Sequence, residues 1–166
     1  MQILRLKSVS RKKRYNYIKS TPEVIAENIL NRDFYADKPN EKWLTDVTEF
    51  KYYDGAEVRK IYLSAILDLY DRRIVSYKIG DSNNNLLVFE TLDEAVKANP
   101  NAHPLFHSDR GFQYTSKIFH SKRIAANMRQ SMSRVGRCIA KVPWRNFGVF
   151  SNPKCIISES LLRVTI

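Results

Sequence analysis

The sequence has few cysteines and no long apolar run, and each absence excludes a class of protein. Its two cysteines, Cys138 and Cys155, have neither the spacing of a zinc site nor the density of a disulfide framework. No run of about 18 apolar residues is present, and the basic first residues lack the apolar segment of a signal peptide. We therefore expect no membrane span and a location in a reducing cytoplasm.

Acidic residues are missing from two long stretches of the chain. Residues 1–20 contain seven Lys or Arg and no Asp or Glu, and no acidic residue lies between Asp109 and Glu159. The whole chain of 166 residues carries a formal net charge of +11. An excess of this size can be a solvated basic surface, but its clustering favours a polyanionic partner, usually nucleic acid.

The pattern of apolar residues predicts an α/β fold, a mixed sheet with the order βββαβαβ and helices packed on it. The turn signals Asp54-Gly55 and Asp71-Arg72-Arg73 join three consecutive strands, so these strands form an antiparallel meander. The predicted elements are a short helix from Ser20 to Leu30, strands over 43–53, 60–70 and 74–79, a helix from a cap at Ser82 or Asn83 to about Ala98, a strand over 104–108, a helix over 115–127 and a strand over 129–132.

Three regions are predicted along the chain. Residues 1–38 form a basic arm and linker, and residues 39–139 form the core domain. Residues 140–166 show neither a clear period nor capping residues, so we interpret them as an aberrant tail.

Two aspartates stand out by their position on predicted strands. Asp46 lies inside the first strand, and Asp109 follows the short apolar strand over 104–108. If these two strands are neighbours, the two carboxylates converge, and a hard divalent cation such as Mg²⁺ or Mn²⁺ relieves their repulsion. From spacing alone, an alternative stays open in which one aspartate caps a turn and the other forms a salt bridge.

Several motifs in order resemble one family. They are WLTDVTEF at 43–50, YLSAILDLYDRRIVSY at 62–77, FHSDRGFQYTS at 106–116 and QSMSRVGRC at 130–138. Together they resemble the transposases of three-carboxylate bacterial insertion sequences, which are related to retroviral integrases, and the resemblance runs from about Leu6 to Ile139. It implies a ribonuclease-H-like fold, Mg²⁺ or Mn²⁺ as cofactor, and DNA strand transfer through a 3′ hydroxyl. It also implies that Asp46 and Asp109 are the first two metal ligands.

The third ligand of the family is a Glu on a helix, 36 positions after the second Asp, and this chain has Arg145 there. A reading-frame slip explains the change. With one choice of codons, a single added A turns residues 140 onward into DKGPMEEFWGILKSEMYYLRV, a tail that resembles the family and contains its Glu. We therefore expect the final catalytic helix to be lost or altered. The amino end also looks short beside the family, which carries a DNA-binding region upstream.

Further residues are weighed by their position and charge. Arg110, Gln113 and Tyr114 come after the second Asp on a predicted active-site loop, and Arg134 and Arg137 form a basic strip, so we expect all five to contact DNA. For His107, a packing or hydrogen-bonding role is favoured over contact with metal or phosphate. Asp68 is expected to be structural, pairing with Arg72 or Arg73.

Three functions are weighed. The first is a transposase core that cuts and joins DNA but is inactive because of Arg145, acting as a homo-oligomer or in a mixed oligomer with intact transposase. The second is a non-catalytic, DNA-binding or transposase-inhibiting product. The third, a host nuclease of the ribonuclease-H type, is disfavoured by the family motifs.

Overall fold

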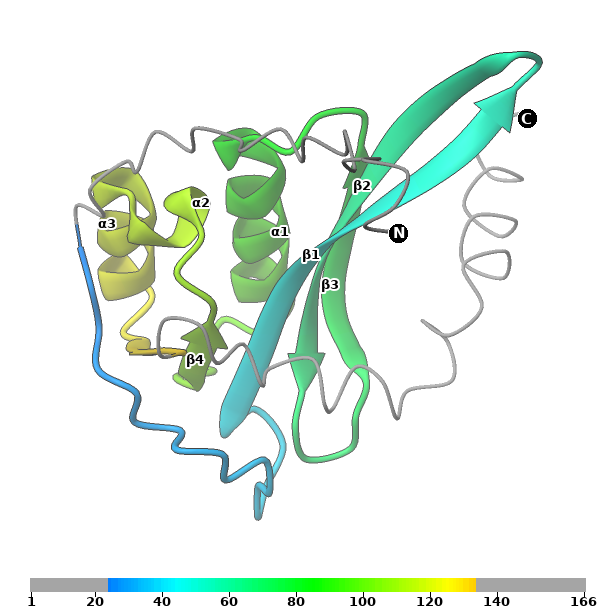
Figure 1. The fold of residues 1–166 in the computed structure, drawn as a ribbon. Helices are drawn as coiled ribbons and strands as arrows, with labels where there is room; N and C mark the ends of the chain where they lie inside the picture. The colour runs from blue at the N-terminus through cyan, green and yellow to red at the C-terminus, as the bar shows by residue number, and fades with distance from the viewer. Residues whose placement is uncertain (1–23, 134–166) are drawn as a thin grey trace, which may run out of the picture.

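The computed structural model describes residues 24–133, and its centre is a five-stranded sheet (Figure 1). The strand order is β3-β2-β1-β4-β5, with β1, β2 and β3 antiparallel and with β4 and β5 parallel to β1. The elements are β1 (Lys42–Asp54), β2 (Glu57–Asp68), β3 (Ile74–Gly80), α1 (Asn85–Ala98), β4 (Leu105–Ser108), α2 (Phe112–Thr115), α3 (Lys117–Ala125) and β5 (Arg129–Met132). The predicted mixed sheet is therefore confirmed, including the placement of β4 parallel to and beside β1.

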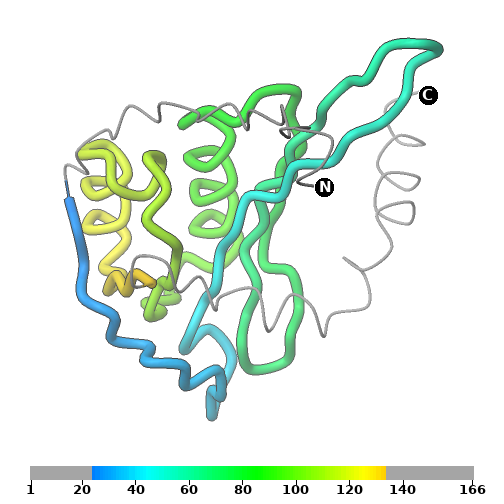
Figure 2. Tube along the Cα trace, viewed as in Figure 1, coloured from blue at the N-terminus to red at the C-terminus, as the bar shows by residue number. Residues whose placement is uncertain are grey.

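The hairpin of β1 and β2 is longer than the sheet behind it. Gly55 stands at its turn with φ of +60°, a left-handed conformation that glycine adopts at little cost. The pairing continues to Asp54 opposite Glu57, whereas β3 ends at Gly80 opposite Tyr62. The tip therefore projects as a two-stranded ribbon away from the helices, as Figure 2 shows.

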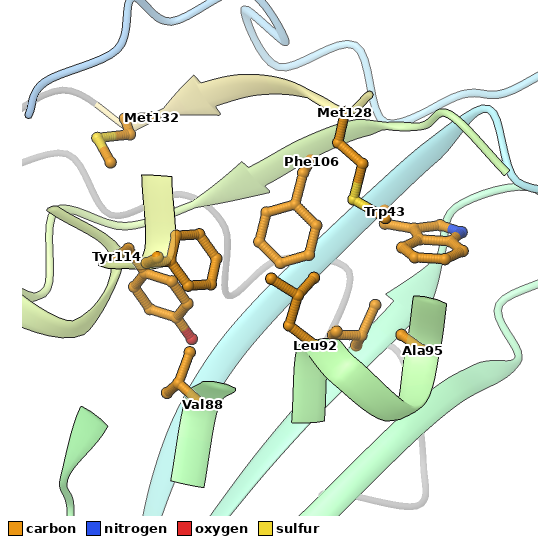
Figure 3. Close-up of a cluster of buried hydrophobic side chains, with 10 residues drawn as sticks. Trp43, Val88, Leu92, Ala95, Phe106, Tyr114, Met128 and Met132 are labelled. Carbon is orange, nitrogen blue, oxygen red and sulfur yellow. The ribbon is translucent and has the colours of Figure 1, made fainter. Parts of the chain in front are cut away.

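The helices cover one face of the sheet and bury an apolar cluster there (Figure 3). Phe119 of α3 is fully buried, and its ring centroid lies 5.7 Å from that of Phe106 on β4 and 5.4 Å from that of Tyr114 on α2. Burying each such side chain contributes about 1.5–3 kcal/mol. The cluster consists of Trp43, Ile66, Val88, Leu92, Ala95, Phe106, Tyr114, Phe119, Met128 and Met132.

The segment before β1 supplies part of the opposite face, and here the prediction of a helix was wrong. Residues 24–30 form no helix, and residues 20–23 lie outside the described residues. The backbone N–H of Met132 donates to the carbonyl of Glu27 at 3.1 Å, and Leu30 N–H donates to Ser131 Oγ at 3.0 Å. Hydrogen bonds to β5 thus take the place of those a helix would make within the segment. The cluster on this face contains Leu30, Ala36, Leu44, Leu63, Ala65, Leu67 and Leu69.

Two helix predictions needed correction at their ends. The cap of α1 is Asn84, whose side chain accepts from Leu87 N–H, rather than Ser82 or Asn83. The helix predicted over 115–127 is α3, which starts at Lys117 because the Ser116 backbone is extended and its side chain accepts from Phe119 N–H. The short helix α2 before it was not predicted. A serine cap competes with a continuous helix, so the chain turns at this residue.

Several predictions fall outside residues 24–133. Arg134, Arg137, Arg145 and the altered final helix are among them, and the boundaries at 38/39 and 139/140 stay predictions. Within the described part of the chain, no helix is long and apolar enough to cross a membrane.

Candidate catalytic carboxylates beside β1 and β4

The two predicted aspartates occupy matching positions on neighbouring strands. The parallel pairing of β1 and β4 ends with Leu44 opposite His107, so two further residues along each strand lead to Asp46 and Asp109. Adjacent strands lie about 4.8 Å apart. Asp109 directly follows the last residue of β4, and both aspartates are partly exposed. The register therefore brings the two carboxylates to one place at the carboxyl end of β4.

The electrostatic surroundings of Tyr114 include both aspartates. Its hydroxyl is buried and lies 3.2 Å from Thr45 Oγ1. Burial raises the pKa of the Tyr114 hydroxyl, and the negative charges of Asp109 and Asp46 raise it further. Because both carboxylates act on one hydroxyl, the two aspartates share a neighbourhood. The phenol stays protonated and can therefore act as a hydrogen-bond donor beside them.

The loop after β4 fixes the carboxylate of Asp109. The amide of Gly111 donates to Asp109 Oδ1 at 2.8 Å. A Cβ at position 111 would meet Asp109 Oδ1 and Gln113 Oε1, each at 2.9 Å, which is closer than real Cβ contacts. A side chain at position 111 would therefore have to displace the ends of these two side chains, and glycine avoids this displacement. It lets the chain pass close to the carboxylate it holds.

Of the three loop residues predicted to contact DNA, one is partly exposed. Arg110 is half-buried, and its Nε donates to the Ser133 carbonyl at 2.9 Å. Gln113 and Tyr114 are 4% and 2% exposed, with Gln113 Nε2 donating to Asn83 Oδ1. Their burial leaves these two little surface for DNA in this structure. The DNA contacts of all three stay predictions.

The donor set at this place fits a hard cation only in part. Two carboxylates supply oxygen ligands of the kind that Mg²⁺ and Mn²⁺ prefer. Among residues 24–133, however, no group of three or more His, Cys, Asp or Glu side chains could hold a metal ion together. If Asp46 and Asp109 hold a cation, they supply two ligands to it, and residues 24–133 group no third such side chain with them.

His107 is engaged in hydrogen bonds at both ring nitrogens. Its Nδ1 lies 2.9 Å from Ser131 Oγ and its Nε2 lies 3.1 Å from Ser133 Oγ. The side chain is 4% exposed, and burial lowers the pKa of His107 to about 4. A neutral imidazole with both nitrogens occupied supports the hydrogen-bonding role and leaves no nitrogen for a metal. The sequence analysis missed both serines, although they alternate with the apolar Met132.

Asp68 is structural, and its pairing with Arg73 is confirmed. The carboxylate is fully buried at the last residue of β2, where it accepts from Asn40 N–H at 2.8 Å and Tyr70 N–H at 3.0 Å. The guanidinium of Arg73 lies 3.8 Å away. Arg72, the other partner considered, donates to the carbonyl of Phe34 instead.

Known proteins share this fold and parts of this sequence. Residues 36–138 match the model of the family described as "Integrase core domain". The HTLV-2 integrase catalytic core domain, solved in complex with magnesium, superposes with a TM-score of 0.54 over 75% of this chain and 74% of its own, at 20% identity. The mixed sheet and this likeness confirm the ribonuclease-H-like fold.

Similarity in sequence extends to curated bacterial proteins. InsK of Escherichia coli (strain K12), the transposase candidate of insertion sequence element IS150, is 40% identical over 140 residues, which is 84% of this chain and 48% of InsK. An uncharacterized transposase-like protein of Haemophilus influenzae is 37% identical over 147 residues, which is 89% of this chain and 66% of that protein. The chain belongs to the integrase core domain family, among the transposases of bacterial insertion sequences. It spans about half the length of InsK.

Proposed function

We propose that this chain is the catalytic core of a transposase that acts on DNA in the bacterial cytoplasm by metal-dependent phosphodiester transfer. The observation that carries the proposal is the parallel register of β1 and β4, which leads from Leu44 and His107 to Asp46 and Asp109. Family membership supplies the class of reaction. The pair of carboxylates supplies the place where it would occur.

Asp46 and Asp109 would hold Mg²⁺ or Mn²⁺ through carboxylate oxygens. When bound, such ions activate an attacking hydroxyl and stabilise the leaving oxygen of a phosphodiester. The protein's own contribution is positional, because the Gly111 amide orients the carboxylate of Asp109. The half-buried Arg110 beside it carries a fixed positive charge near any phosphate that approaches.

We further propose that the chain as written does not join DNA. Arg145 stands where the family has its third carboxylate, and an arginine cannot lose its proton in a protein. It therefore removes one metal ligand and adds repulsion toward a second cation. Arg145→Glu alone should not restore activity, because the residues around it also depart from the family pattern.

A cleavage and joining assay on terminal-repeat DNA with Mn²⁺ tests this proposal. We expect no product from the chain as written, and we expect metal binding to improve when residues 140 onward are replaced by the restored-frame tail. Robust joining by the unaltered chain, abolished by Asp109→Asn, would contradict the inactive state.

The charge distribution favours a second candidate function that needs no catalysis. A net charge of +11, with no acidic residue from 110 to 158, suits a product that occupies DNA or forms mixed oligomers with intact transposase. DNA affinity should then fall steeply as salt is raised, since binding releases counterions. A flat salt response, or no binding at low salt, would remove this candidate.

A further inference from the structure

Three buried residues form a connected polar group under the catalytic loop, and we name it the serine–histidine clamp. It consists of His107 on β4, Ser131 on β5 and Ser133 just after β5, with exposed fractions of 4%, 0% and 6%. Met132, between the serines, is fully buried in the cluster on the helix side. Because side chains alternate along a strand, both serines point to the other face, where His107 lies between them.

The clamp is satisfied by its own members. A neutral imidazole has one N–H donor and one acceptor nitrogen, and a serine hydroxyl can serve either role. The contacts of 2.9 Å to Ser131 Oγ and 3.1 Å to Ser133 Oγ therefore use both nitrogens of His107. A fully satisfied buried network of this kind restricts the positions of the groups it joins.

Ser133 connects the clamp to the residues on either side of Asp109. Its N–H donates to the Ser108 carbonyl at 3.0 Å, and its own carbonyl accepts from Arg110 Nε at 2.9 Å. The β4–β5 ladder ends one residue earlier, with Ser108 opposite Met132. Ser133 is thus held beyond the ladder, and its side-chain bond to His107 is one of the contacts that fix it there.

Ser131 connects the clamp to the segment before β1. Ser131 Oγ accepts from Leu30 N–H at 3.0 Å as well as contacting His107, and Met132 N–H donates to the Glu27 carbonyl at 3.1 Å. Residues 24–30 therefore anchor the clamp from outside the sheet. Their extended course along β5 is what makes the Leu30 amide available to the serine.

We propose that His107 is a positioning residue that holds Ser133 in place and thereby keeps the Asp109 carboxylate opposite Asp46. It acts through Ser133 and contacts neither metal nor DNA. The inference rests on the proposed function only in treating Asp109 as a metal ligand. The restraint on the loop from Ser108 to Gly111 does not depend on a bound metal.

Two substitutions at position 107 separate the ends of the clamp. His107→Gln places a polar atom near the position of Nε2 and can keep the contact with Ser133, whereas His107→Asn reaches only the position of Nδ1 and keeps the contact with Ser131. Ser133→Ala should behave as His107→Asn does, and Ser131→Ala serves as the matched control at the other end. Thermal unfolding of the full chain shows whether all four variants remain folded.

The first readout is hydrogen exchange of the Gly111 amide in the metal-free full chain, since this amide donates to Asp109 Oδ1. We expect its protection to fall on the order of tenfold in His107→Asn and Ser133→Ala, and to stay near the unaltered value in His107→Gln and Ser131→Ala. Equal protection in all variants, or loss in every variant in proportion to lost stability, would overturn the proposal.

The second readout is Mn²⁺ affinity, with Asp109→Asn as the control that removes the ligand itself. Loss of a group that orients a metal ligand typically weakens binding by about 10–100-fold, so His107→Asn should bind Mn²⁺ at least about tenfold more weakly than His107→Gln. Equal Mn²⁺ affinity of these two variants would contradict the proposal. If the unaltered chain binds no Mn²⁺, the proposed metal site fails, and the exchange experiment still decides the role of His107.

Discussion

The sheet carries aspartates in two different surroundings. Asp68, at the end of β2, is fully buried, both of its oxygens accept backbone N–H groups, and Arg73 lies nearby. Asp46 in β1 and Asp109 just after β4 are partly exposed, and Asp109 Oδ1 accepts the Gly111 amide. A carboxylate whose two oxygens both accept backbone N–H groups stabilises the fold. Partial exposure beside a second carboxylate marks one that can take a cation.

The largest effect on stability is expected from Asp68→Ala. It removes the charged acceptor of the Asn40 and Tyr70 N–H groups, and each hydrogen bond to a charged group is worth about 1.5–3 kcal/mol, so the free energy of unfolding should fall by about 3–5 kcal/mol. Urea denaturation measures this change. Asp71→Ala is the matched control, because Asp71 is exposed and its bridge to Arg73 at 3.4 Å is worth at most about 1 kcal/mol. Equal losses of stability in the two variants would contradict the claim that the buried Asp68 stabilises the fold more than the exposed Asp71.

The next effect is a pH dependence due to His107 on β4. Its pKa of about 4 lies below the ordinary value of 6.5, so the unfolded chain binds a proton in this window that the folded chain does not. This contribution to stability is complete above pH 6.5 and is lost as the pH falls toward 4, with a slope of at most about 1.4 kcal/mol per pH unit. Denaturation at several pH values should show a shallower slope for His107→Gln. Identical slopes for the two proteins would contradict a buried, neutral His107.

A smaller effect on stability is expected at the start of α1, away from the three aspartates. Asn84→Ala removes the oxygen that accepts from Leu87 N–H at 2.9 Å, and loss of such a cap typically costs about 1 kcal/mol. Asn84→Ser, which can still cap the helix, is the control. Thermal unfolding should rank the unaltered chain and Asn84→Ser together, above Asn84→Ala.

The smallest change in stability should come from Gly111→Ala, although the site should respond. The new Cβ would displace the ends of two side chains, Asp109 Oδ1 and Gln113 Oε1, rather than backbone. We expect the free energy of unfolding to change by less than about 1 kcal/mol. Mn²⁺ binding should weaken measurably in calorimetry, since the displaced oxygen belongs to a proposed ligand. Unchanged Mn²⁺ binding would mean that Asp109 holds no ion in this position.

The sequence was sufficient for the elements whose patterns are local. Alternation along residues 43–79 and the turn at Asp54-Gly55 predicted the meander, and β5 was placed correctly over 129–132. The adjacency of Asp46 and Asp109 was expected from the family resemblance and fits the parallel pairing of β1 with β4. In these cases the signal lies in neighbouring residues or in a motif that spans the site.

Features that depend on distant partners were not predictable. A helix was predicted from Ser20 to Leu30, but Glu27 and Leu30 form hydrogen bonds with β5, about a hundred positions along the chain. The clamp of His107 with Ser131 and Ser133 depends on the register of two strands, which no local pattern specifies. The helix predicted over 115–127 starts later than expected, because Ser116 has an extended backbone and its side chain caps α3 from Lys117 onward.

The most direct test of the account is a Mn²⁺ titration of the full chain beside Asp46→Asn, Asp109→Asn and Asp68→Asn. The account predicts weak binding by the unaltered chain, loss of that binding in Asp46→Asn and in Asp109→Asn with folding intact, and reduced stability in Asp68→Asn without loss of the site in the folded fraction. Binding that survives both Asp46→Asn and Asp109→Asn would contradict the central claim that these two carboxylates form one metal site.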